Sequence, residues 1–275
     1  MRIPDDWMYV NDRQLTPFRV HEVSEPHIFC FEPVDSLSAP EGKLEVLLPD
    51  MRIYREDECY IRYIGTTDEG WEKAYLRISY GEKVNHAQVK VSKQHAQIGV
   101  KTVLNSMAAE HLVVESGGFI FHCAFIECAG KAILFTAPSG TGKSTQAELW
   151  NAHRGTRIIN GDRAAVCIKN EQITAEGIPF SGSSAYCDNG SLPLAAIVYL
   201  SQAPQTSIRQ LYGMDAFFKI WEGISVNSWV KEDVNRVSEA VQKIAEQIPV
   251  YHLSCTPDET GVCVLEDVLR KQGIV

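Results

Sequence analysis

At residues 137–145 the chain carries the run Ala-Pro-Ser-Gly-Thr-Gly-Lys-Ser-Thr, and no other segment constrains its fold as strongly. The apolar residues 131–136 before this run predict a strand, and residues 146–150 after it predict a helix. Glycine at 140 and 142 lets the backbone turn its N–H groups inward around an anion, where side chains would obstruct them. The run therefore predicts a phosphate loop in an α/β fold; the alternative is an ordinary Gly/Ser-rich turn.

The predicted phosphate loop implies a nucleotide site with a bound metal. Lys143 would reach the terminal phosphates as a point charge, and the Ser144 hydroxyl is placed to ligand Mg²⁺. The expected cofactors are therefore ATP and Mg²⁺. One position departs from the strict pattern, because Ala137 stands where the leading glycine is usual. The expected nucleotide contacts are Ser139, Gly140, Thr141, Gly142, Lys143, Ser144 and Thr145.

Asp162 is the candidate for a second metal ligand. It comes just after an apolar strand predicted over 156–160, and strand ends in α/β sheets bring side chains to one ligand-facing edge. The alternative is that Asp162 is a turn residue after Gly161.

His122 is the candidate catalytic residue. Strands predicted over 119–127 and 131–136 would pair antiparallel through the turn at Ala129-Gly130. Counting register from that turn puts His122 opposite Thr136 or Ala137, under the expected phosphates. The alternative is a structural strand histidine.

Composition excludes some partners. The net charge of −9 offers no general attraction to phosphate backbones, so we expect no nucleic-acid partner. No apolar run approaches the ~18 residues of a membrane span, and the first residues lack a signal-peptide profile. We expect a cytoplasmic protein without a membrane partner.

Residues 1–95 and 96–275 differ in their sequence patterns and predict two segments. Residues 1–95 contain short runs in which apolar and polar residues alternate, such as 43–47, 59–64 and 73–80. These runs predict antiparallel strands with one solvent-exposed face. Residues 96–275 carry the motifs. They begin with a helix predicted over 97–115 and ended by Gly117-Gly118.

Taken together, the motifs resemble the kinase core of HPr kinase/phosphorylase-like proteins, which carry a phosphoenolpyruvate-carboxykinase-type P-loop. The resemblance covers about residues 97–270 and implies an α/β P-loop core beside an N-terminal β-rich segment. It also implies that His122 lies beside the transferred phosphoryl group and that Asp162 helps to hold Mg²⁺. The segments that carry it are 121–124, 130–135, 137–145, 159–163, 177–182, 193–200 and 249–253.

One departure from that family concerns the catalytic base. In the carrier-protein kinases two adjacent aspartates end the second strand, and the first is taken as the base; here that position is Gly161. His122 is the substitute by position, and histidine exchanges protons near neutral pH. Phosphoryl transfer depends mostly on positioning and charge stabilisation, so the loss of one base need not abolish activity.

The resulting prediction is a kinase that uses ATP, or a related donor, to phosphorylate a serine-type hydroxyl of a peptide, protein or small molecule. The expected catalytic residues are His122, Lys143 and Asp162, and the expected metal ligands are Ser144 and Asp162. Two alternatives stay open: a nucleotide-binding accessory or regulatory protein without transfer activity, and a true HPr-type kinase/phosphorylase. The sequence leaves the acceptor open, and a homo-oligomer is compatible with it.

Overall fold

The computed structural model describes residues 14–18, 20, 22, 26–67, 70–81, 86–95 and 100–274. The chain divides into two units, Met1–Leu112 and Val113–Val275, which are described separately. This division falls later along the chain than the predicted boundary after residue 95. The predicted start of a helix at Gln97 and the segment expected to lack a signal peptide lie outside the described residues.

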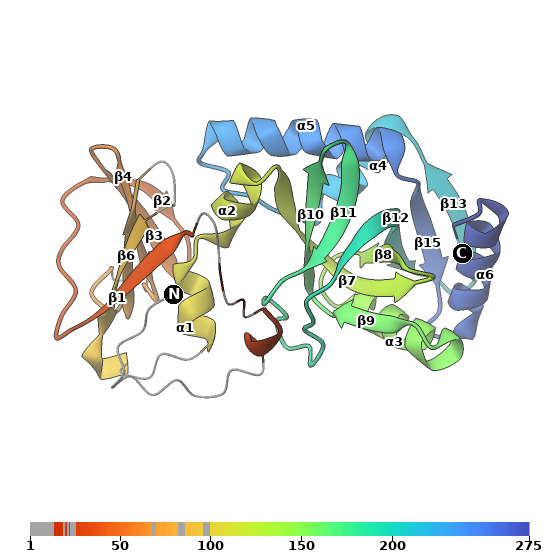
Figure 1. Cartoon of the computed structure of the whole chain (residues 1–275), viewed down its shortest axis with the longest axis horizontal. Helices are drawn as coiled ribbons and strands as arrows, with labels where there is room; N and C mark the ends of the chain where they lie inside the picture. The colour runs from red at the N-terminus through yellow and green to blue at the C-terminus, as the bar shows by residue number, and fades with distance from the viewer. Residues whose placement is uncertain are drawn as a thin grey trace. The chain divides into compact units, whose positions relative to one another are not determined.

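The first unit is built on a mixed six-stranded sheet with the order β1-β6-β5-β4-β3-β2 (Figure 1). Its strands are β1 (Ile28–Val34), β2 (Lys43–Leu47), β3 (Met51–Glu56), β4 (Cys59–Ile64), β5 (Leu76–Tyr80) and β6 (His86–Ser92), and short 3-10 helices span Thr16–Phe18 and Lys93–His95. Of the neighbouring strand pairs in this sheet, β1 and β6 are parallel and the others are antiparallel. The strands predicted over 43–47 and 59–64 are confirmed, and β5 occupies the second part of the third predicted run.

The single helix predicted over 97–115 is wrong. The described part of this segment forms two short helices, α1 (Val100–Ser106) and α2 (Ala109–Glu115). Between them Ala108 has a positive φ of 47°, which no helix interior accommodates, and its side chain is buried in the core of the first sheet. Burial of Ala108 therefore outweighs the continuous helical pattern. Gly117, with a φ of 84°, ends α2 as predicted.

The second unit contains a nine-stranded sheet whose main path is β11-β10-β7-β8-β12-β15-β13, with β9 and β14 also paired to β7. The strands are β7 (Gly118–Cys128), β8 (Lys131–Thr136), β9 (Arg157–Asn160), β10 (Arg163–Lys169), β11 (Gln172–Gly177), β12 (Ser191–Gln202), β13 (Ser207–Leu211), β14 (Ile224–Ser225) and β15 (Val250–Cys255). Strands β8, β12 and β15 are parallel neighbours, and β7 pairs with β8 antiparallel. The α/β class expected from the sequence is confirmed.

Four helices cover the two faces of this sheet (Figure 1). They are α3 (Lys143–Arg154), α4 (Gly213–Trp221), α5 (Lys231–Gln247) and α6 (Glu259–Lys271). In β8, Ile133 and Phe135 belong to the cluster formed with α3 and α6, whereas Leu134 belongs to the cluster formed with α4 and α5. Because strand side chains alternate between faces, β8 is buried on both sides and fixes the position of the loop that follows it.

Strand β7 changes partners along its length. Residues 118–122 pair with β10, and residues 123–128 pair with β8. His122 is the last residue before this change, so it lies where the ends of β8 and β9 and the start of β10 meet.

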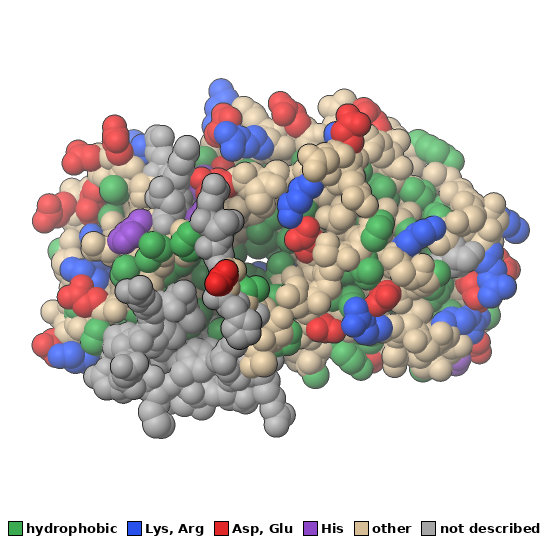
Figure 2. Space-filling model, in the orientation of Figure 1, with side chains coloured by type: hydrophobic (Ala, Val, Ile, Leu, Met, Phe, Trp, Pro, Cys, Tyr) green, Lys and Arg blue, Asp and Glu red, His purple; other side chains and the backbone are tan. Residues whose placement is uncertain are grey.

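The visible face of the molecule carries no large field of one sign. Figure 2 shows acidic and basic side chains interspersed over it, in keeping with a chain of net charge −9. Within the described residues, no helix combines the length and apolar character that crossing a membrane demands.

Candidate nucleotide-binding and catalytic site

The predicted phosphate loop lies between β8, which ends at Thr136 as predicted, and α3, which begins at Lys143 and contains the predicted helical run 146–150. Gly140 and Gly142 have positive φ values of 77° and 117°, which favour glycine. A Cβ added to either would meet nothing within 4 Å, so the loop faces open space at both glycines. Ala137 is buried in the core shared with α3 and α6, which explains why a methyl group is accommodated at the departing position.

Lys143 folds back over this loop. Its Nζ donates to the carbonyl oxygens of Ala137 at 3.0 Å and Pro138 at 3.4 Å, and only 7% of the residue is exposed. Burial lowers the pKa of Lys143 from its ordinary value, while the nearby Asp162 carboxylate acts in the opposite direction. The ammonium group is therefore held against the loop by two backbone carbonyl oxygens.

The first turn of α3 is tied to the end of β9. Ser144 Oγ donates to the carbonyl oxygen of Gly161 at 3.1 Å, next to the Asp162 backbone. The other predicted nucleotide contacts keep accessible positions: Ser139, Gly140 and Thr145 are exposed, while Thr141 is half-buried. The structure thus brings the loop and Asp162 to one place, as the sequence predicted.

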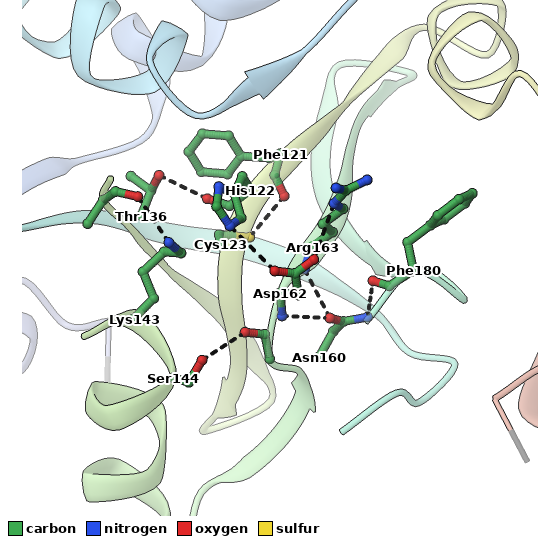
Figure 3. A network of polar contacts seen from close by, with 12 residues as sticks. Phe121, His122, Cys123, Thr136, Lys143, Ser144, Asn160, Asp162, Arg163 and Phe180 are labelled. Atoms are coloured by element: carbon green, nitrogen blue, oxygen red, sulfur yellow. Dashed lines mark hydrogen bonds and ion pairs between the residues drawn. The ribbon is translucent and has the colours of Figure 1, made fainter. Parts of the chain in front are cut away.

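Asp162 lies between two cationic or proton-bearing side chains (Figure 3). Its Oδ1 is 3.4 Å from His122 Nε2, and its Oδ2 is 3.2 Å from Arg163 Nε. The contact with His122 holds the pKa of Asp162 below its ordinary value, and the charge of Arg163 adds to this effect. The pairing of His122 with Arg163 across β7 and β10 is the local reason that the three side chains converge.

The backbone of His122 is fixed on both sides. Its N–H donates to the Gly223 carbonyl at 2.7 Å, and its carbonyl accepts from Thr136 Oγ1 at 3.0 Å. The β7–β8 register pairs Cys123 with Thr136, so His122 comes one position beyond the ladder, toward Ala137. The side chain remains 36% exposed and is therefore reachable from solvent.

Asn160 organises the site and was missed as a site residue by the sequence analysis. Its Oδ1 accepts from the backbone N–H groups of Asp162 at 2.9 Å and Arg163 at 3.0 Å. Its Nδ2 donates to the carbonyls of Ile178 at 2.9 Å and Phe180 at 3.1 Å. The fully buried amide thus joins the turn that carries Asp162 to the segment after β11 (Figure 3). The only sequence signal was an asparagine at a strand end.

Replacement of Asn160 by alanine should lower the free energy of unfolding by roughly 2–4 kcal/mol, because four part-buried backbone groups lose the partner that this buried amide provides. Urea denaturation measures this change. The control is Asn235→Ala on the exposed side of α5, which should change stability little. Equal midpoints for both variants would contradict the assigned role.

The segment 181–184 packs directly against the site. A Cβ added to Gly182 would lie 2.8 Å from Asp162 Cγ, so the backbone of this loop approaches the carboxylate more closely than a side chain would allow. A Cβ added to Gly161 would collide with Ser184 Oγ. Ser184 therefore occupies the space into which a side chain at position 161 would project.

No group of three or more His, Cys, Asp and Glu side chains suitable for a metal ion exists in the described part of the chain. A metal shared with phosphate oxygens needs fewer protein ligands, and Ser144 in the first turn of α3 donates to Gly161, the neighbour of Asp162 in the turn between β9 and β10.

Comparison with known proteins gives one family. The family model described as "ScmC: SynChlorMet cassette protein ScmC" matches residues 89–269. No curated protein matches the sequence. Among solved structures, the HPr(Ser) kinase/phosphatase from Coxiella burnetii aligns with 11% identity over 56% of this chain and 93% of that chain, with a TM-score of 0.33. This structural likeness is weak, whereas the family model spans more than half of the chain.

Proposed function

This chain belongs to the family of SynChlorMet cassette protein ScmC, and we propose that it is a Mg²⁺-dependent phosphotransferase that moves a phosphoryl group from ATP to a serine-type hydroxyl. The acceptor hydroxyl belongs to a peptide, a protein or a small molecule. The observation that supports the proposal most directly is the convergence of Lys143, Ser144, Asp162 and His122 around one open, glycine-containing loop.

The residues present suit Mg²⁺-ATP. The loop glycines leave room for phosphate oxygens beside backbone N–H groups at the start of α3, where the helix dipole favours an anion. The partly desolvated Lys143 can exchange two carbonyl acceptors for phosphate oxygens. When bound, Mg²⁺-ATP would supply the transferable group and the metal charge that offsets its negative charge.

Ser144 and Asp162 are the residues that would hold the metal. Both present oxygen atoms, which Mg²⁺ prefers. The lowered pKa of Asp162 keeps its carboxylate ionised at neutral pH, so its charge is available to the cation. Arg163, beside Asp162, adds a positive charge that does not depend on the metal.

His122 would hold the proton of the acceptor hydroxyl. When Nε2 carries its hydrogen toward Asp162 Oδ1, the lone pair of Nδ1 is free to accept a proton. Asp162 then acts on the ring as an orienting partner in addition to its role toward the metal. The partial exposure of His122 leaves the ring accessible to an acceptor.

A nucleotide-binding accessory protein without transfer activity is the second candidate. The collision between a side chain at position 161 and Ser184 favours it, because the site has no room for a carboxylate there. Incubation with Mg²⁺-ATP and candidate hydroxyl compounds, peptides and proteins separates the two. Acceptor-dependent ADP formation together with a phosphate mass on the acceptor supports the kinase; ATP binding without turnover on any acceptor supports the accessory protein. Reversal by inorganic phosphate would instead indicate an HPr-type kinase/phosphorylase.

Asp162→Asn should keep most of the affinity for ATP in the absence of metal and lose the enhancement that Mg²⁺ gives. The amide retains the shape of the carboxylate but lacks the charge that a hard cation requires. Calorimetric titration of ATP with and without Mg²⁺ measures the enhancement. The matched control is Asp267→Asn on the exposed side of α6. An undiminished Mg²⁺ effect in Asp162→Asn would make Asp162 a turn residue.

A further inference from the structure

A cavity of about 490 Å³ opens beside the predicted phosphate loop, and no role has yet been given to it. Its walls come from the loop, the first turn of α3, the end of β12 and the segment between β15 and α6. Lys143, Ser144 and Asp162 do not line it, although Gly142 and Thr145 next to them do. A larger cavity, of about 780 Å³, lies by Arg154 at the other end of α3, away from all predicted site residues.

Gln146 gives the smaller cavity a buried polar group without a partner. The residue is 2% exposed, lines the cavity and has no hydrogen-bond partner for Nε2 in the described structure. Its Oε1 has only a long contact of 3.9 Å from Cys255 Sγ. Buried amide groups in folded proteins are nearly always paired, so an unpaired one in a cavity wall indicates a missing ligand.

A glycine on α6, Gly261, leaves the Gln146 amide uncovered. A Cβ added to Gly261 would lie 3.5 Å from Gln146 Nε2 and 3.3 Å from Cys255 Cβ. Any longer side chain at this position would fill the space next to the amide. Gly261 therefore lets α6 pass close to Gln146 without covering it.

The remaining walls suit a flat, partly apolar group. Leu200, Ala203, Pro204 and Pro257 contribute apolar surface. The volume lies within the range of roughly 300–1,000 Å³ that is usual for small-molecule sites. Since Gly140, Thr141 and Gly142 form one wall, a ligand in this cavity is continuous with an anion held by the loop amides.

We propose that this cavity binds the nucleoside of the donor nucleotide, with Gln146 Nε2 donating a hydrogen bond to an acceptor atom of the base. The inference rests on the proposed function, because it requires a nucleotide whose phosphates occupy the loop. It assigns recognition of the donor to residues outside the run 137–145, namely Gln146 and the apolar walls from β12, the residues after it and the segment before α6. Phosphate binding and nucleoside binding are therefore separable.

Calorimetric titration of the full-length chain with Mg²⁺-ATP and with Mg²⁺-tripolyphosphate tests this separation. The wild type should bind ATP at least about tenfold more tightly than tripolyphosphate, and Gln146→Leu should lose most of that preference while its tripolyphosphate affinity stays unchanged. Ala203→Phe, which fills the cavity from another wall, should have the same selective effect. The control Gln242→Leu, on the exposed side of α5, should bind both ligands as the wild type does.

The outcomes separate the two proposals. Equal affinity of the wild type for both ligands, or full retention of the ATP preference in both cavity variants, overturns the nucleoside site and leaves the phosphate loop intact. A parallel loss of tripolyphosphate binding in a variant that melts like the wild type also overturns it, because Gln146 would then act on the loop. If the wild type binds neither ligand, the proposed function fails and the nucleoside site fails with it.

Discussion

Replacement of Lys143 by alanine is expected to weaken the binding of Mg²⁺-ATP about ten- to hundredfold. The side chain is the cation closest to the predicted phosphate loop, and a charge-assisted hydrogen bond to a phosphate contributes ~1.5–3 kcal/mol. The low exposure of Lys143 strengthens the effect, since less water screens the contact. Isothermal titration calorimetry measures the affinity.

The matched control for this experiment is Lys169→Ala. Lys169 is an exposed lysine of β10 whose Nζ pairs with Glu176, and its removal should leave ATP affinity unchanged. Thermal melting of both variants shows whether the fold is retained. If Lys143→Ala binds Mg²⁺-ATP as tightly as the wild type, the loop is not the nucleotide site.

His122→Gln is expected to reduce turnover about 10²–10⁴-fold while ATP affinity holds, which is the usual cost of removing a general base. Glutamine can still hydrogen-bond to Asp162 or to an acceptor hydroxyl, but it cannot take up a proton near neutral pH. The measurement is the rate of acceptor phosphorylation at saturating Mg²⁺-ATP, with ATP affinity measured separately by calorimetry.

His153→Gln is the control for this variant. His153 lies at the far end of α3 with its Nδ1 3.5 Å from Glu259, so it too is a half-exposed histidine beside a carboxylate. Its replacement should leave turnover unchanged. Wild-type turnover in His122→Gln would reduce His122 to a structural strand residue.

The parts of the fold that the sequence predicted well are those with strong local signals. The strand over 131–136 was located to the residue, because an apolar run followed by the glycine-containing loop marks its end, and the helix predicted over 146–150 lies within α3. The helical pattern over 97–115 failed, since nothing local announces that Ala108 is buried with a positive φ. Strand β11 was not predicted, because only two of its side chains, Ile173 and Ala175, are buried apolar groups, which is a weak alternating signal.

The site could be predicted only where a motif or a hairpin register carried it. Counting register from the turn at Ala129-Gly130 predicted that His122 lies near the end of β8. The position of Asp162 just after a strand predicted that it lies at the ligand-facing edge, and in the structure it contacts His122. Asn160 and Gln146 act through groups that lie far from them in the chain, such as the Phe180 carbonyl and the segment before α6. Contacts of that kind depend on how the second unit closes, which no local pattern records.

The position of Ser184 next to Gly161 also limits which substitutions this chain can accept. An aspartate at 161 would place its first side-chain atom in space that Ser184 Oγ already fills, so the two positions must change together. A single substitution toward the carboxylate would disturb the loop next to Asp162 before it could supply a base. A chain with Gly161 and Ser184 therefore cannot gain a carboxylate at position 161 unless the segment 181–184 changes first.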